Sequence, residues 1–259
     1  CYSSVLQEHI ATRKAAGLFD VTHMGVFQAE GPDAAVFLDV VCGNDVMSLK
    51  LGASIYTHSM DPHANVIDDL LVYRRDVDKY LVVVNAANEA KDWAWLNAVR
   101  NGEVMVDPDR PWVRAPGRKV ILRNLKDPNE GEDQLVDIAL QGPHSRDILL
   151  KLAEPAEERR IRRLNRSQLC EAVLGGMHVV VSRTGYTGER MCFELFVHPD
   201  EAVKFWNALL EAGKPFGLEP CGLGARDSLR TEAGLPLYGH EMGGDLNLTI
   251  GEAGFLPFL

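Results

Sequence analysis

The 259-residue sequence has few cysteines and no long hydrophobic run. Its five cysteines, at positions 1, 42, 170, 192 and 221, are odd in number and form no CxxC pair. This argues against a zinc site or a disulfide framework and favours a reducing compartment, the cytoplasm or the mitochondrial matrix. No stretch approaches the roughly 18 to 20 apolar residues of a membrane span, and no signal peptide is visible. We therefore expect no membrane-spanning segment.

The sequence also lacks an excess of basic residues, since its formal net charge is −10. A phosphate backbone needs a basic face, so nucleic acid is not expected as a partner. The stretch "EERRIRRLNR" is a local exception, with five arginines at Arg159, Arg160, Arg162, Arg163 and Arg166. Its composition is typical of a solvated helix face. The alternative is a docking surface for an acidic partner.

Several motifs of known chemistry are absent. There is no HExxH or other dense ligand spacing, which predicts no metal site, and no GxSxG elbow that would supply a nucleophile. "GLGARDSLRTEAG" lacks the third glycine of a dinucleotide fingerprint. It instead predicts a helix with Arg226 and Arg230 on one face, where they could hold an anion or form a salt bridge with Asp227 or Glu232.

Apolar spacing and turn signals predict the order of elements. The predicted helices cover 4–18, 33–44, 88–100, 143–154, 200–213 and 222–234, with Asn88 as a possible cap. The predicted strands cover 21–31, 54–60, 66–74, 80–84, 103–106, 118–125, 135–141, 168–174, 177–184 and 192–198. This order is roughly β-α-β-β-α-β, repeated, which favours an α+β protein with two split βαβ units. The Pro-, Gly- and charge-rich segment 107–133 is expected to contain an exposed insertion.

The stretch "VIDDLLVYR" places two carboxylates in an apolar strand, where an unpaired charge costs several kcal/mol. Side chains alternate along a strand, so Asp69 shares a face with Leu71 and Tyr73, whereas Asp68 shares the other with aliphatic residues. We interpret Asp68 as a core-facing group near the strand start, where backbone amides could satisfy it. Asp69 either does the same or lies on the wall of a pocket.

A second candidate stretch is "SRTGYTGE". Gly185 and Gly188 flank Tyr186, which predicts a tight loop with the ring at its apex, available for stacking or packed in a turn. In the following strand, Glu194 stands among apolar residues. It either faces outward or meets a polar ligand edge.

Together these motifs resemble one family. "GLFDVTHMG", "VIDDLLVYR", "VVVNAAN", "ALQGP", "SRTGYTGE", "FEL" and "GLGARDSLRTEAGLPLYGHEM" follow the order seen in the aminomethyltransferases, the T-proteins of the glycine cleavage system. The likeness covers nearly the whole chain. The link Arg190, Met191, Cys192, the stretch 110–119 and the tail "NLTIGEAGFLPFL" depart from the usual pattern, and related folate-dependent demethylases share much of it.

The resemblance implies that an aminomethyl carbon passes from a lipoyl carrier (H) protein to tetrahydrofolate, with release of ammonia. It implies that Asp69 lies beside the reactive folate nitrogens as the catalytic carboxylate, and that Glu194 binds the amide and amino edge of the pterin. The other folate-lining positions that it implies are Tyr56, Leu71, Tyr73, Asn85, Tyr186 and Arg226. The arginines at 159–166 would then meet the carrier. A noncatalytic folate-binding protein is disfavoured, because the KGCYxGQE-like motif of that class is absent.

The resemblance also implies a domain plan. It predicts two ferredoxin-like domains, a discontinuous first one of residues 1–27 and 137–245 and a second one of residues 28–136. Residues 246–259 would lead to a C-terminal β domain absent from this chain. A sequence that begins at Cys1 and stops in "GFLPFL" fits the expectation that both ends are cut.

Overall fold

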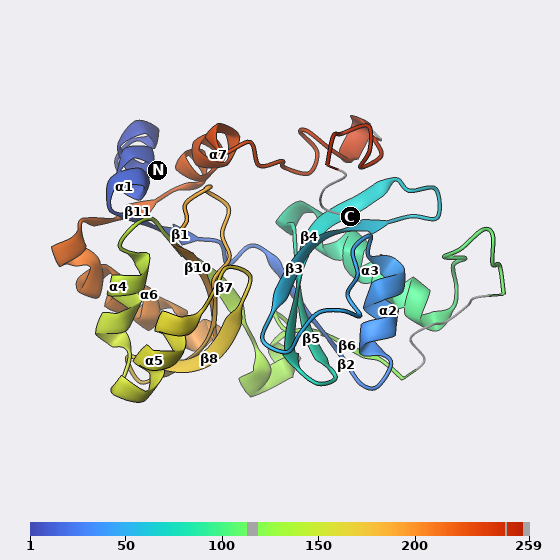
Figure 1. Ribbon diagram of the computed structural model, residues 1–259, viewed down its shortest axis with the longest axis horizontal. Coiled ribbons are helices and arrows are strands. Elements are labelled where there is room, and N and C mark those ends of the chain that lie inside the picture. The colour runs from blue at the N-terminus through green and yellow to red at the C-terminus, as the bar shows by residue number, and fades with distance from the viewer. Residues whose placement is uncertain (113–118, 247, 256–259) are drawn as a thin grey trace. The chain divides into compact units, whose positions relative to one another are not determined.

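The structure, a computed structural model, describes residues 1–112, 119–246 and 248–255. It divides into two compact units, which are described separately (Figure 1). Unit 1 comprises residues 1–23 and 131–235, and unit 2 comprises residues 24–130 and 236–259.

Unit 2 is built on a five-stranded antiparallel sheet with the order β3-β4-β5-β2-β6. Its elements are β2 (Gly25–Glu30), α2 (Ala34–Val41), β3 (Ser54–Met60), β4 (Val66–Asp76), β5 (Lys79–Val84), α3 (Glu89–Asn101) and β6 (Ile121–Asn124). Without β3, the order β4-β5-β2-β6 is that of a ferredoxin-like unit, in which each βαβ half is split by a strand of the other half. The predicted α+β, split-βαβ architecture is therefore confirmed for this unit.

The core of unit 2 lies on one face of this sheet. Leu70 and Val72 of β4 pack there with Phe37 of α2 and Leu96 of α3. The alternation of β4 thus places Asp68 on the helix-covered face and Asp69 on the opposite one, as the sequence predicted.

Unit 1 contains a six-stranded sheet with the order β11-β1-β7-β10-β9-β8. Its elements are α1 (Val5–Lys14), β1 (Ala16–Asp20), β7 (Val136–Gln141), α4 (Ser145–Leu152), α5 (Pro155–Arg163), β8 (Leu169–Leu174), β9 (Met177–Ser182), β10 (Cys192–Val197), α6 (Pro199–Gly213), β11 (Leu218–Cys221) and α7 (Leu223–Glu232). Strands β11, β7, β10 and β9 follow the ferredoxin-like order. Strand β1 is inserted between β11 and β7, parallel to the first and antiparallel to the second.

Helices α4, α5 and α6 cover one face of this sheet (Figure 1). Ile148, Ile161 and Phe205 of these helices pack against Leu140 and Phe193 of β7 and β10. The opposite face carries Gln141 and Glu194, so this face holds the polar groups of unit 1.

Three expectations need correction. The helix predicted over 4–18 ends at Lys14, because the largely buried residues Ala16–Asp20 enter the sheet as β1. Residues 103–106 do not form a strand, because they join no ladder of the sheet and Val104 and Val106 instead pack against the core of unit 2. The domain boundary placed at residue 27 would cut β2, whose whole length pairs with β5, and residues 236–245 group with unit 2 rather than unit 1.

None of the helices in the described part of the chain has the length and apolar character needed to cross a bilayer.

Candidate functional site

Asp69 of β4 is held by two donors from neighbouring strands of unit 2. The Tyr56 hydroxyl on β3 donates to its Oδ2 at 2.9 Å, and the Asn85 side-chain amide after β5 donates to its Oδ1 at 2.8 Å. Burial, together with the nearby Asp68 carboxylate, raises the pKa of Asp69 to about 6. Asp69 is therefore a positioned carboxylate that can exchange a proton near neutral pH. The structure thus brings three predicted site residues together.

Asp68, on the opposite face of β4, is fully buried. It accepts hydrogen bonds from the backbone and the side chain of Asn85, both at 2.9 Å, and from the Asn88 side chain at 2.5 Å. The expectation of backbone amides is confirmed for one donor, the Asn85 N–H, whereas the other two are side-chain amides. Asn88 occupies the N-cap position of α3, but its side chain binds Asp68 and makes no capping bond, so its predicted capping role is corrected.

Asp92 of α3 completes this cluster, and sequence reasoning missed it. It is 2% exposed and lies within hydrogen-bonding reach of Asp68. Burial and the Asp68 carboxylate raise the pKa of Asp92 to about 10, so its carboxyl group is protonated at neutral pH. Asn88 and Asp92 are spaced i, i+4, and this spacing in "NEAKD" is the signal that could have found them.

His58 of β3 is the register partner of Asp69 on β4. It is fully buried, its ring stands edge-on to the Tyr56 ring at a centroid distance of 5.2 Å, and burial lowers its pKa to about 4. Among the described residues, neither ring nitrogen has a hydrogen-bond partner. Of the other predicted positions on this face, Leu71 is partly exposed, whereas Tyr73 is fully buried.

Glu194 of β10 is the central acid of unit 1, and it is 8% exposed. The Thr184 hydroxyl donates a short hydrogen bond to it and also lies 3.0 Å from the Ser182 hydroxyl. Asp137 of β7 projects from the same sheet face, and burial followed by the charge of Glu194 raises the pKa of Asp137. Asp137 was missed, although its alternation with Gln141 along β7 could have indicated it.

The loop between β9 and β10 presents Tyr186. Gln141 accepts hydrogen bonds from the Tyr186 backbone at 3.1 Å and from the Thr187 hydroxyl at 2.7 Å. The Arg226 guanidinium of α7 lies over the Tyr186 ring, 4.3 Å from its centroid. The loop is tight because a Cβ at Gly185 would lie 2.6 Å from the Cys192 Cβ.

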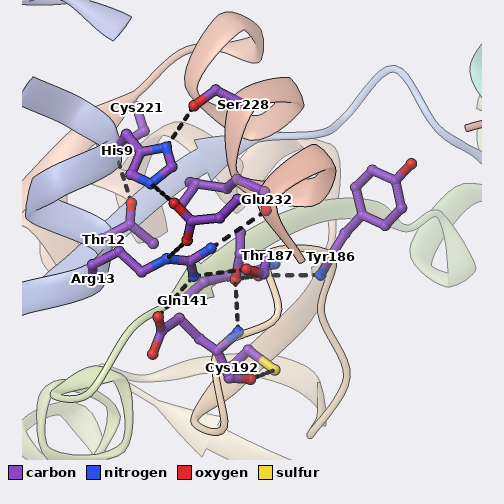
Figure 2. Close-up of polar contacts among 12 residues, drawn as sticks. His9, Thr12, Arg13, Gln141, Tyr186, Thr187, Cys192, Cys221, Ser228 and Glu232 are labelled. Carbon is purple, nitrogen blue, oxygen red and sulfur yellow. Dashed lines mark hydrogen bonds and ion pairs between the residues drawn. The ribbon is translucent and has the colours of Figure 1, made fainter. Parts of the chain in front are cut away.

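An arginine at the end of α1 fixes this loop to α7. Arg13 donates to the Thr187 carbonyl and to the Glu189 carboxylate, both at 2.7 Å, and to Glu232 at 2.8 Å. His9 also contacts Glu232, at 3.0 Å. Figure 2 shows that the Tyr186 ring points away from this network, so the network holds the loop backbone and leaves the ring outside it.

The two arginines of α7 have different environments. Arg226 stacks on Tyr186, whereas Arg230 forms an intrahelical salt bridge with Asp227 at 2.8 Å. The salt-bridge alternative is therefore confirmed for Arg230. Glu232 pairs with Arg13 of α1.

In the parts of the chain that the structure describes, no group of three or more His, Cys, Asp or Glu side chains could hold a metal ion. The chemistry of these sites rests on carboxylates, amides, hydroxyls and one stacked guanidinium.

Comparison with known proteins gives a consistent result. The model of the GCVT N-terminal domain family matches residues 1–256. An aminomethyltransferase of Symbiobacterium thermophilum is 42% identical over 93% of this chain and 59% of its own length. One from Caldanaerobacter subterraneus subsp. tengcongensis is 40% identical over 99% of this chain and 62% of its own length.

A solved structure of glycine cleavage system aminomethyltransferase T from Bartonella henselae is also similar. It has a TM-score of 0.74 at 32% identity, covering 93% of this chain and 57% of that chain. The present chain thus spans about three fifths of the length of these relatives. With the family model matched over almost its entire length, the chain belongs to the GCVT N-terminal domain family, among whose members are the aminomethyltransferases of glycine cleavage.

Proposed function

We propose that this chain is the folate-binding part of an aminomethyltransferase of the glycine cleavage system. It would move an aminomethyl carbon from a lipoyl carrier protein to tetrahydrofolate, with release of ammonia. The observation that carries the proposal is the position of Asp69, a carboxylate held by Tyr56 and Asn85 in a chain of this family.

Asp69 would act electrostatically. Two donors fix its oxygens at 2.9 and 2.8 Å, so little reorganisation is needed when positive charge develops on the transferred carbon. Its pKa of about 6 leaves it mostly ionised at neutral pH and also allows it to accept a proton from a folate nitrogen.

Glu194 would bind the pterin edge. A carboxylate that accepts two parallel N–H bonds fits an amide beside an amino group. Glu194 is nearly buried and is held by Thr184, which limits its rotation. The stacked pair of Tyr186 and Arg226 supplies a flat, cationic surface that suits a ring system or the carboxylates of a folate tail.

The arginines of and after α5 are the proposed contact for the carrier protein. Arg160 and Arg162 pair with Glu157 and Glu158 at 3.4 and 3.2 Å on their own helix, and both arginines remain more than half exposed. Surface pairs of this kind contribute little to stability, so these charges remain available to an acidic partner. The remaining members of the run, Arg159, Arg163 and Arg166, are also exposed.

The docking contact can be tested by charge reversal. The variant Arg162→Glu/Arg163→Glu should bind the carrier more weakly, with a smaller dependence on salt, while Lys204→Glu on the exposed side of α6 serves as a control. Unchanged affinity of the double variant would remove this surface from the proposal.

The location that goes with this function is a reducing one, the cytoplasm or the mitochondrial matrix. The cysteines in the structure are all free, which agrees with this proposal.

The function itself is tested by titrating the protein with tetrahydrofolate by calorimetry, followed by a carbon-transfer assay with aminomethylated carrier. Glu194→Gln should abolish measurable folate binding, while Glu171→Gln on an exposed position of β8 should retain it. Asp69→Asn should retain binding but lose carrier-dependent transfer. Folate binding without carrier-dependent turnover in the unmodified protein would favour a folate-dependent demethylase, and no folate binding at all would overturn the proposal.

A further inference from the structure

The cluster of Asp68, Asp69 and Asp92 places three carboxyl groups in one buried region of unit 2. Two of them, Asp68 and Asp92, have almost no exposed surface. Like charges so close and so buried cannot all be ionised at an acceptable cost. At least one proton must therefore reside on the cluster.

The hydrogen-bond donors show where this proton resides. Asp68 receives two hydrogen bonds from Asn85 and one from Asn88, as an ionised carboxylate would, and one of its roughly four acceptor sites is left for a further donor. Asp69 receives bonds from Tyr56 and Asn85. Among the described residues, no donor reaches either oxygen of Asp92.

An ionised Asp92 would therefore be a buried, unsatisfied charge. A proton on Asp92 removes the charge and lets its hydroxyl donate to Asp68, which lies within reach. Lys91, the neighbouring cation on α3, points its ammonium group to the Ile67 carbonyl at 2.5 Å and to the Tyr238 hydroxyl at 2.8 Å.

One side chain connects this buried pair to Asp69. The Asn85 amide nitrogen lies 2.9 Å from the Asp68 carboxylate and 2.8 Å from the Asp69 carboxylate, so its two hydrogens can serve both. Asp68 and Asp69 together orient the Asn85 amide, and a hydroxyl donor on Asp92 would stabilise the ionised Asp68 that accepts from it.

We propose that Asp92 is a positioning residue that keeps the proton of this cluster, and that through Asp68 and Asn85 it fixes the orientation and the charge of Asp69. As a contribution to carbon transfer, this inference rests on the proposed role of Asp69. The groups that face Asp69 are Tyr56 and His58 from β3 and Asn85 after β5, while Asp68 and Asp92 lie on the helix-covered side of the sheet.

Two variants separate the hydrogen bond from the bulk of the side chain. Asp92→Asn keeps a neutral donor, whereas Asp92→Leu keeps the volume and removes the donor. Asp147→Asn, at an exposed site on α4, is the control for changing an aspartate on a helix.

The first readout is stability, which needs no folate. If Asp92 is protonated in the folded state and ionised in the unfolded state, unfolding releases a proton above pH 4. Asp92→Asn should then gain stability relative to the unmodified protein as the pH rises from 4 to 9 in urea denaturation. A difference that stays constant over this range would show an ionised Asp92 and overturn the inference.

The second readout is the titration of Asp69, which is measured by carbon-13 NMR of labelled aspartate carboxyls in the free protein. Asp92→Leu removes the donor and should destabilise the ionised form of Asp68. Because less negative charge then lies near Asp69, the midpoint of the Asp69 titration should fall by about one pH unit. Asp92→Asn should leave that midpoint in place. Equal shifts in both variants, or none in either, would contradict the positioning role.

The carbon-transfer assay adds the functional readout. In the Asp92→Leu variant, the acidic limb of the pH profile of carbon transfer should shift relative to the unmodified protein. In the Asp92→Asn variant, this limb should stay where it is in the unmodified protein. If folate binding fails altogether, the stability and NMR results still decide the state of Asp92, so the failure of the proposed function and that of this inference are distinguishable.

Discussion

The Arg226 guanidinium lies 4.3 Å from the centroid of the Tyr186 ring, so a charge on α7 is held against the face of a loop tyrosine. The loop backbone that carries this ring is held by Gln141 and Arg13. Unit 1 therefore supports its aromatic group from both the sheet and the helices, which is the arrangement expected of a preorganised contact surface.

Truncation of this pair should weaken folate binding. Arg226→Met keeps the length of the side chain and loses the cation, which is expected to cost about 0.5–2 kcal/mol, or about 2- to 30-fold in Kd. Calorimetric titration with tetrahydrofolate measures the change. Arg226→Lys should recover part of the loss, and an unaltered Kd for Arg226→Met would argue that the pair serves only to pack the loop.

Gln141 is expected to matter for stability through the two donors that it satisfies. Gln141→Met would leave the Tyr186 N–H and the Thr187 hydroxyl without this acceptor, at a cost of about 1–3 kcal/mol. Thr187→Val removes only one of the two bonds and should cost less. Urea unfolding of both variants gives the order, and the reverse order would refute this account of the loop.

Gly185 should not tolerate a side chain. The Cβ of alanine would lie 2.6 Å from the Cys192 Cβ and 2.7 Å from its sulfur, so the loop or β10 must shift. Gly185→Ala is expected to destabilise the protein by about 1–3 kcal/mol. Adding Cys192→Gly should reduce this penalty in a double-mutant cycle, whereas strictly additive effects would show that the contact is unimportant.

His58 should make the protein sensitive to acid. Its folded-state pKa of about 4 lies below the ordinary value of about 6.5, so between these pH values the unfolded state binds one more proton. His58 therefore lowers the free energy of unfolding as the pH falls through that window, by at most about 1.4 kcal/mol per pH unit.

The test compares His58→Leu with the unmodified protein in urea at several pH values. The stability of the variant relative to the unmodified protein should rise steadily from pH 6.5 to pH 4. Using the difference removes the contribution of Asp69, whose raised pKa acts in the opposite direction in both proteins. Parallel stability curves would show that His58 gains a proton without unfolding.

Much of this architecture was accessible from the sequence, for reasons that particular residues illustrate. The period-two pattern of "VIDDLLVYR" separated Asp68 from Asp69 correctly, because one face of β4 is buried by helices and this fixes the register. The same pattern could not predict the partners of these acids. Asn85 and Asn88 belong to later elements, and only the fold brings them to β4.

Other features were inaccessible because they depend on competition between local and tertiary contacts. Asn88 has the residue type and the position of a helix cap, but its side chain is oriented to donate its Nδ2 to the buried Asp68 carboxylate, and its oxygen accepts no capping bond. Arg226 and Arg230 look equivalent on a helical face. Asp227 forms a salt bridge with Arg230, and the loop whose Tyr186 stacks on Arg226 comes from another part of the chain.

The insertion of β1 between β11 and β7 has a consequence for how the chain reaches its fold. β1 is made before the described strands of unit 2, but its parallel neighbour β11 is made only after all of them. Pairing so distant in sequence raises the contact order and slows folding. On the ribosome, the backbone groups along one edge of β1 stay unpaired until β11 has been made. We expect nascent chains to depend most on protection from aggregation at this unpaired edge.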